Sequence, residues 1–158
     1  MSHNGMCCRI RFAVIGALLC LAMVCAAAVI VSLEQLNIGL TDRSIVIVWL
    51  CASLGGAIPC LGAAAVGWRV SSIVARDKTF SVETAKLLSF ISTCAYVDAA
   101  YGFAANIIMG FLGFQHPSVL IVSCALILLA LAAGTAFAAL ARLVQKAADL
   151  QEESDYTV

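Results

Sequence analysis

The chain has 158 residues, of which 63% are hydrophobic and 11% are charged, and its formal net charge is zero. This apolar share exceeds the roughly 45–50% of a typical soluble domain, and one small core cannot hide such an excess. A neutral chain without a basic stripe also gives no support for direct nucleic-acid binding. The composition therefore argues against a soluble domain and favours an integral membrane protein.

The apolar residues fall into four blocks, each long enough to cross a bilayer. About 20 residues of helix span a hydrocarbon layer ~30 Å thick, and backbone amides in lipid need partners within the helix. We predict an all-α fold: an integral membrane bundle of four transmembrane helices, forming a single domain over residues 1–158. The predicted helices cover residues 12–33, 45–68, 87–114 and 118–151, and the last one extends beyond the membrane.

The first block has two interpretations. A basic flank and small residues near positions 26–28 also fit a cleaved signal peptide. However, the apolar run continues to Leu33 and is longer than a signal core of about 7–15 residues. We therefore expect an uncleaved first helix.

The basic residues lie beside the apolar blocks rather than inside them, and their distribution predicts the threading. Placing both termini and the 69–86 connection in the cytoplasm leaves only Arg43 outside, and cytoplasmic connections are the ones rich in Lys and Arg. We predict that both termini are cytoplasmic and that the two outer connections are short. The inner basic residues are Arg9, Arg11, Arg69, Arg76, Lys78, Lys86, Arg142 and Lys146.

One acidic residue, Asp98, lies inside the third block. It is about 17 Å along the helix from Leu87, near the bilayer centre, where an aspartate costs about 2.5–3.5 kcal/mol. Tyr101 and Asn106 share its helical stripe, which should face inward. Because the four apolar cores, the last of which ends at residue 141, contain no Lys, Arg or His, we expect a protonated Asp98 that donates to a hydroxyl or carbonyl of another helix. The alternative is a proton or cation site.

The second block contains helix-breaking and small residues. Pro59 removes a backbone donor and predicts a kink, which Gly55 and Gly56 should ease. A broken helix can mark a transporter's binding site, but the chain has no inverted repeat, so close helix packing is the expected role. Small residues recur every fourth position, which lets helices approach closely in lipid. They are Ala52, Gly56, Cys60 and Ala64 in the second block, and Ala130, Gly134 and Ala138 in the fourth.

The eight cysteines predict no metal site, because no CxxC pair or Cys/His cluster with zinc spacing occurs. Six of them lie in predicted helices, where cysteine packs as a small apolar residue. No set of nucleophile, base and oxyanion donor and no phosphate-binding loop is present. We therefore predict neither a cofactor nor an enzymatic activity.

Two segments on the predicted cytoplasmic side are more distinctive. Ser81 should cap the third helix, with Glu83 in its first turn and Phe80 anchored at the membrane interface. The fourth helix meets neither Gly nor Pro at the membrane edge, so it should continue for about three turns. An apolar stripe on this extension needs cover from the 69–86 connection or from a partner. The stripe consists of Leu143, Ala147 and Leu150.

The segments KTFSVETAKLL and KAADLQEESDYTV together resemble the DUF2975 family, small four-helix bacterial membrane proteins of unknown function. Members carry a similar F-S-x-E/K-N-x-x-x-L segment and a tail like A-x-x-L-x-E-E-N-D-L-T-V, and the resemblance extends over the whole chain in length and helix count. Thr84, Ser154 and Tyr156 replace Asn, Asn and Leu. The matching positions are Phe80, Ser81, Glu83, Leu150, Glu152, Glu153, Asp155, Thr157 and Val158.

The resemblance implies a multi-pass protein of the bacterial cytoplasmic membrane. Family genes often lie beside a gene for a small helix-turn-helix regulator, which implies a regulatory pair. We predict a non-enzymatic membrane anchor or sensor for such a cytoplasmic partner. In it, residues 80–88 and 142–158 would pack into one cap, although the cap could equally serve only to close the bundle.

The alternative function is a small transporter or immunity-type protein that uses Asp98 as a proton or cation site. The expected partners are the lipid bilayer, the regulator and a second copy of the chain.

Overall fold

The structure, a computed structural model, describes residues 3–38, 42–74, 81–113 and 117–155, and every regular element in these ranges is a helix. Phe80, Thr157 and Val158 lie outside the described residues, as do the side chains of Glu152, Glu153 and Asp155. The helices are α1 (His3–Ile38), α2 (Arg43–Gly55), α3 (Ala57–Val74), α4 (Val82–Phe111) and α5 (Pro117–Asp155).

Four helical segments are long and apolar enough to cross a membrane, which confirms the prediction of an all-helical fold with four such helices. They are Arg11–Glu34, Arg43–Ile73, Val82–Phe111 and Pro117–Gln151. The helices themselves extend beyond the predicted bounds at most ends, because hydropathy indicates where lipid lies and not where a helix stops. α4 instead ends earlier than predicted, at Phe111, since Gly113 follows with φ 73°, a left-handed conformation that terminates helices.

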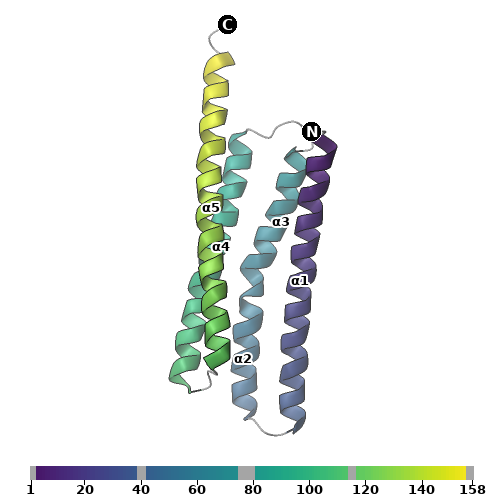
Figure 1. Cartoon of the computed structure of the whole chain (residues 1–158), viewed down its shortest axis with the longest axis vertical. Coiled ribbons are helices and arrows are strands. Elements are labelled where there is room, and N and C mark those ends of the chain that lie inside the picture. The colour runs from purple at the N-terminus through teal and green to yellow at the C-terminus, as the bar shows by residue number, and fades with distance from the viewer. Residues whose placement is uncertain (1–2, 39–41, 75–80, 114–116, 156–158) are drawn as a thin grey trace.

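The predicted second helix, residues 45–68, is two helices, α2 and α3, separated by Gly56. They run end to end as one rod (Figure 1). Pro59 is in the first turn of α3, where it has no N–H for the Gly55 carbonyl and its ring crowds that carbonyl. The prediction of a single kinked helix over residues 45–68 is therefore corrected to two helices, α2 and α3, that meet at Gly56. Gly55 and Pro59 lie on either side of this break.

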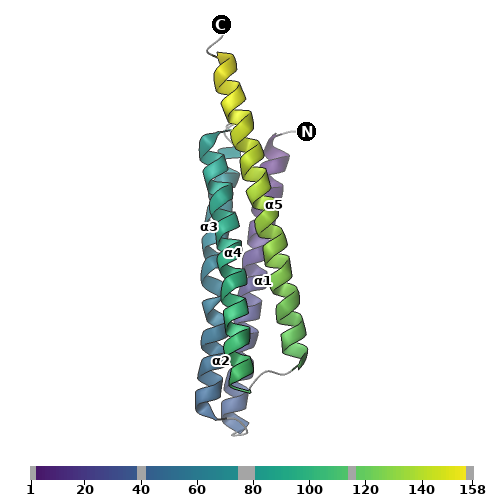
Figure 2. The same ribbon diagram turned by 90° about the vertical axis from the view of Figure 1, so that its left-hand side faces the viewer.

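The helices form an open arc rather than a closed bundle. α4 packs against α5 on one side and α3 on the other, while α1 packs against α2 and α3. Within the described residues, α5 makes no comparable contact with α1, α2 or α3. Figures 1 and 2 show the resulting row of α5, α4, α3 and α1 curving in space. In the part that the structure describes, α4 and the rod of α2 and α3 thus each have packed neighbours on two sides, whereas α1 and α5 lie at the ends of the row.

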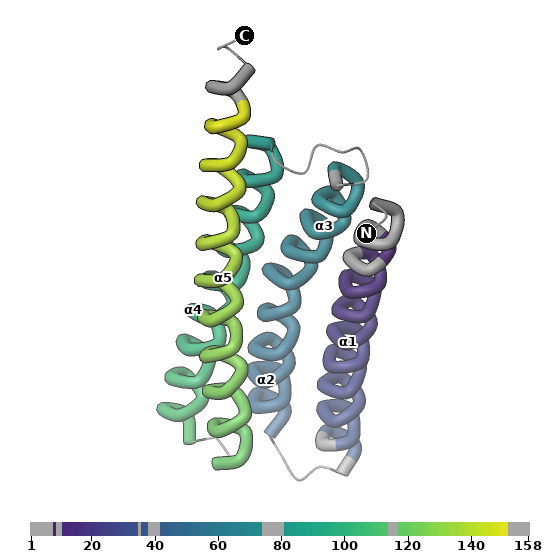
Figure 3. The backbone as a smooth tube through the Cα atoms, turned by 45° about the horizontal axis from the view of Figure 1, so that its top comes forward, coloured from purple at the N-terminus to yellow at the C-terminus, as the bar shows by residue number. Residues whose placement is uncertain are grey.

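The bundle has two distinct ends. α1 begins, α3 ends, α4 begins and α5 ends at the same end (Figure 1), which we call the terminal end. At the opposite end α1 ends, α2 begins, α4 ends and α5 begins (Figure 1). α5 projects beyond the other helices at the terminal end (Figure 3), so its last turns lie outside the packed part of the molecule.

Candidate functional site

Asp98 lies on α4 opposite the break between α2 and α3. Its Oδ2 accepts a hydrogen bond from the Cys60 thiol at 3.7 Å, and a Cβ added at Gly56 would lie 3.4 Å from its Oδ1. Gly56 and Cys60 belong to the small-residue stripe, which therefore faces α4 as expected for close packing. The neighbour of the carboxyl is a thiol, however, and not the hydroxyl or carbonyl group that we predicted.

Tyr101 lies one turn from Asp98 and covers the end of α2. Its hydroxyl donates to the Cys51 carbonyl at 3.0 Å. A Cβ added at Gly55 would overlap this hydroxyl, so the close approach of the ring requires a glycine there. The Tyr101 side chain is 36% exposed and therefore sits at the edge of the helix interface rather than fully inside it.

Asn106 faces a different neighbour. Its Nδ2 donates to the Gly102 carbonyl at 2.8 Å, and its Oδ1 accepts from the Ser123 hydroxyl of α5 at 2.7 Å. The prediction of one inward stripe is therefore corrected: Asp98 and Tyr101 contact α2 and α3, whereas Asn106 contacts α5. The reason is that α4 lies between two neighbours and has two packed faces.

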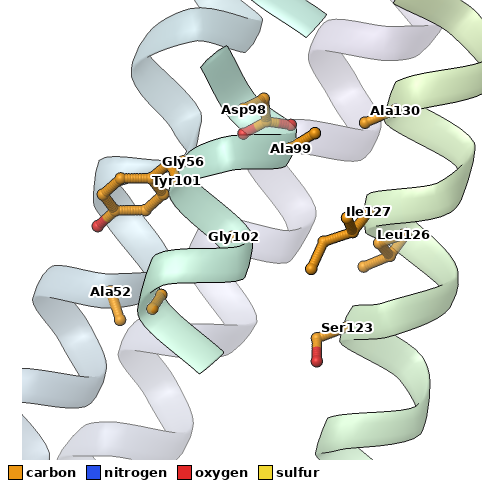
Figure 4. A pocket seen from close by; sticks show the side chains of 11 residues that line it. Ala52, Gly56, Asp98, Ala99, Tyr101, Gly102, Ser123, Leu126, Ile127 and Ala130 are labelled. Atoms are coloured by element: carbon orange, nitrogen blue, oxygen red, sulfur yellow. The ribbon is translucent and has the colours of Figure 1, made fainter. Parts of the chain in front are cut away.

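An open cavity of about 180 Å³ lies between α2, α4 and α5. Figure 4 shows Asp98 and Gly102 of α4 with Ile127 and Ser123 of α5 around it. Asp98, Tyr101 and Ser123 are its polar lining residues within the described part of the chain. The apolar lining consists of Ala52, Gly56, Ala99, Gly102, Ala105, Leu126, Ile127 and Ala130. Asp98 therefore faces open space whose described lining is mostly apolar.

The start of α4 has the predicted cap. The Thr84 amide donates to the Ser81 hydroxyl oxygen at 3.2 Å, and Glu83 lies in the first turn, where it meets the positive end of the helix. The Thr84 hydroxyl lies 3.0 Å from that of Ser81, and Thr84 is buried. Thr84 was noted in the sequence only as a departure from the family pattern. Its place three residues after the cap was the signal that could have revealed its contact with Ser81.

The beginning of α4 packs against the later part of α5. Of the predicted cap of residues 80–88 and 142–158, Phe80 and the side chains after Gln151 lie outside the described residues. A core cluster joins the two helices at the terminal end, and it contains Ala85, Leu88, Ala141 and Val144 with Phe137 packed against them. We call this cluster the terminal core. It brings together segments more than fifty residues apart in the sequence.

The predicted apolar stripe on the α5 extension is not the face that packs. Ala141, Val144 and Ala148 are the buried residues there, whereas Leu143 and Leu150 are 65% and 66% exposed. The extension therefore has two apolar faces, because the terminal core occupies one and leaves the other open. Within the described residues nothing covers Leu143 or Leu150.

Two contacts between helices were missed in the sequence. The Ser92 hydroxyl donates to the Gly134 carbonyl at 2.8 Å and joins α4 to α5. The Arg11 guanidinium lies 5.4 Å from the centre of the Trp68 ring and joins α1 to α3. A basic residue and a tryptophan at the same predicted membrane level were the available signal for the second contact. Among the residues described, no group of three or more His, Cys, Asp or Glu side chains could hold a metal ion.

Comparison with known families supports the resemblance seen in the two motifs. The family described as "Protein of unknown function (DUF2975)" matches residues 41–158. The chain belongs to the DUF2975 family. No curated protein and no solved structure matches it.

The DUF2975 match begins just before α2. The expectation that the resemblance covers the whole chain is therefore corrected, since α1 lies outside the match. The DUF2975 region nevertheless contains the helix break, the cavity beside Asp98 and the terminal core. These three features are the candidates for a function shared across the family.

Proposed function

We propose that the protein is a non-enzymatic anchor or sensor in the bacterial cytoplasmic membrane that holds a soluble partner at its terminal end. The observation that carries this proposal is the uncovered apolar face of the α5 extension, where Leu143 and Leu150 are 65% and 66% exposed. Full burial of a leucine is worth about 1.5–3 kcal/mol. A partner that covers both residues would therefore gain substantial binding free energy.

The proposed threading puts this face in the cytoplasm. Arg11, Arg69, Lys86, Arg142 and Lys146 lie in the helix segments near the terminal end, whereas Arg43 starts α2 at the other end. Lys and Arg are enriched in cytoplasmic flanks of membrane helices. This asymmetry supports a cytoplasmic position for both termini.

The chemistry of the extension suits a helix-binding groove. Leu143 and Leu150 are seven residues apart, two turns along one face, and Arg142, Lys146 and Asp149 surround them in sequence. An amphipathic helix of this kind lays its apolar face into a hydrophobic groove with a polar rim. A small helix-turn-helix regulator, as implied by the neighbouring genes of the family, is the partner that we propose.

Co-purification tests this function. The full chain is co-expressed with the product of the adjacent regulator gene and purified in mild detergent. Replacing Leu143 and Leu150 with Ser should abolish recovery of the regulator, whereas Gln145→Ala, an exposed polar control on the same extension, should leave it unchanged. A chain that ends at Gln151 measures the contribution of the tail. Equal recovery with the double variant would eliminate the extension as the docking surface.

A second candidate function is a small transporter or immunity-type protein that uses Asp98 for a proton or cation. The observation that favours it is the position of the carboxyl beside an open cavity and a broken helix, two features of substrate sites in membrane transporters. Flux measured in proteoliposomes should be lost in Asp98→Asn. Flux that persists in this variant would count against the transporter.

A further inference from the structure

The cavity beside Asp98 has a negative group but no positive one. Among the described residues that line it, Asp98 is the only charged side chain. Its Oδ2 accepts the Cys60 thiol, and no hydrogen bond engages its Oδ1 within the described residues. A carboxylate is stabilised by an opposite charge within about 4–6 Å. A cation from outside the chain would supply that charge.

The oxygen-bearing side chains of the lining do not suit a divalent metal ion. Hard cations such as Ca²⁺ or Mg²⁺ take roughly six oxygen ligands, and only three lining side chains carry oxygen, those of Asp98, Tyr101 and Ser123. The Tyr101 hydroxyl is bound to the Cys51 carbonyl, and the Ser123 hydroxyl is within hydrogen-bond distance of Asn106 and Leu120. Asp98 is thus the remaining side chain free to meet a cation in the described lining.

The walls suit an organic cation. The Tyr101 ring lines the cavity close to Asp98, and a carboxylate together with an aromatic face attracts quaternary ammonium groups. Gly102, Ala105 and Ile127 continue the wall along α4 and α5, and Ala105 is about 10 Å along the helix from Asp98. The volume of about 180 Å³ far exceeds the roughly 10–15 Å³ that a single water molecule requires. This space holds a small charged head with a short apolar group.

We propose that the cavity between α2, α4 and α5 binds a monovalent organic cation, with its ammonium head at Asp98 and its apolar group against Ala105 and Leu126. The cavity is open to the surface of the bundle at the level of an apolar span, so the ligand enters from the lipid. Small residues at Gly56 and Ala99 leave room for the head. This inference rests on the second function proposed above and not on the first.

Equilibrium dialysis of radiolabelled benzyltrimethylammonium tests the site. The full chain is purified in maltoside micelles, which contain no ammonium group, and empty micelles give the baseline. We expect saturable binding of one ligand per chain. Asp98→Asn should weaken it by at least about tenfold, or ~1.4 kcal/mol. Glu34→Gln, an exposed acid on α1 away from the cavity, is the matched control and should bind as the wild type does.

Asp98→Asn could fail to fold, which its elution from a sizing column would reveal. A second variant then tests the site. Ala105→Leu retains the carboxyl and fills the far end of the cavity. It should weaken benzyltrimethylammonium by several fold and leave the smaller tetramethylammonium unaffected.

Two results would overturn the site. One is the absence of saturable binding to the wild type, and the other is binding that neither Asp98→Asn nor Ala105→Leu weakens, which would report partition into the micelle. Neither result bears on the anchor function. Asp98→Asn should still co-purify with the regulator, and the Leu143/Leu150 double variant should still bind the organic cation.

Discussion

Gly55 and Tyr101 show how a single residue shapes the centre of the molecule. The ring reaches the Cys51 carbonyl only because Gly55 has no Cβ. A larger residue would push the ring away and expose the end of α2 beside Asp98. The wall of the cavity therefore depends on this glycine as much as on the acid itself.

Gly55→Ala should destabilise the protein, because the added Cβ displaces the Tyr101 hydroxyl and its hydrogen bond. We expect a loss of about 1–2 kcal/mol in the free energy of unfolding, measured by denaturant titration in detergent. Gly16→Ala is the control, since nothing lies within 4 Å of a Cβ there. It should be neutral or stabilising by up to ~1 kcal/mol.

A double variant separates this clash from a change in helix propensity. In the Tyr101→Leu background, Gly55→Ala should cost much less than in the wild type, because the contacting group is gone. An equal cost in both backgrounds would contradict the assigned contact.

Local rules predicted several residues correctly but not their partners. Ser81 and Pro59 act through their own backbone neighbours, so sequence spacing sufficed. Asp98 was found as an intramembrane acid, yet its Cys60 neighbour depends on how two helices are placed. The Ser92–Gly134 hydrogen bond depends in the same way on the approach of α4 to α5.

At the scale of the elements, the start of α4 relies on its cap. Ser81→Ala removes the oxygen that accepts the Thr84 amide and should cost about 1 kcal/mol. Hydrogen exchange at the first amides of α4 should speed up, while Ser81→Asp, which keeps an acceptor, should preserve protection. Ser72→Ala, at a serine bonded to the Trp68 carbonyl of its own helix, is the control. Unchanged exchange in Ser81→Ala would rule out the cap.

The α4–α5 interface depends on a second glycine. A Cβ at Gly134 would lie 3.1 Å from the Tyr96 ring, so Gly134→Leu should force the helices apart and cost about 1–3 kcal/mol of unfolding free energy. Ala136→Leu lies on the exposed side of the same helix and should have little effect. Similar losses in both variants would mean that the interface has been placed on the wrong face of α5.

The position and length of the spans followed from hydropathy, but their faces did not. Lipid tails are as apolar as leucine, so the pattern inside a span does not distinguish a packed face from a lipid-facing one. Only polar and small residues indicated the inward side. α4 contains enough polar and small residues to indicate a packed helix. The α5 extension has two apolar faces, and the sequence analysis predicted packing for the face that is in fact exposed.

At the scale of the whole molecule, the sequence did not predict that the helices form an open arc. Four apolar blocks suggest a closed bundle, yet α5 contacts α4 without closing on α1 within the described residues. None of the apolar window of α1 is buried, and α1 also lies outside the family match. Within the described residues, α4 takes part in both the cavity and the terminal core.

Side-specific thiol labelling in intact cells tests the threading most directly. In a variant with all eight cysteines replaced, Asp42→Cys and Glu83→Cys place single thiols at exposed positions at opposite ends of the bundle. A membrane-impermeant maleimide should label Asp42→Cys in intact cells and Glu83→Cys only after permeabilisation. Labelling of Glu83→Cys in intact cells would contradict the account and remove the cytoplasmic docking surface with it.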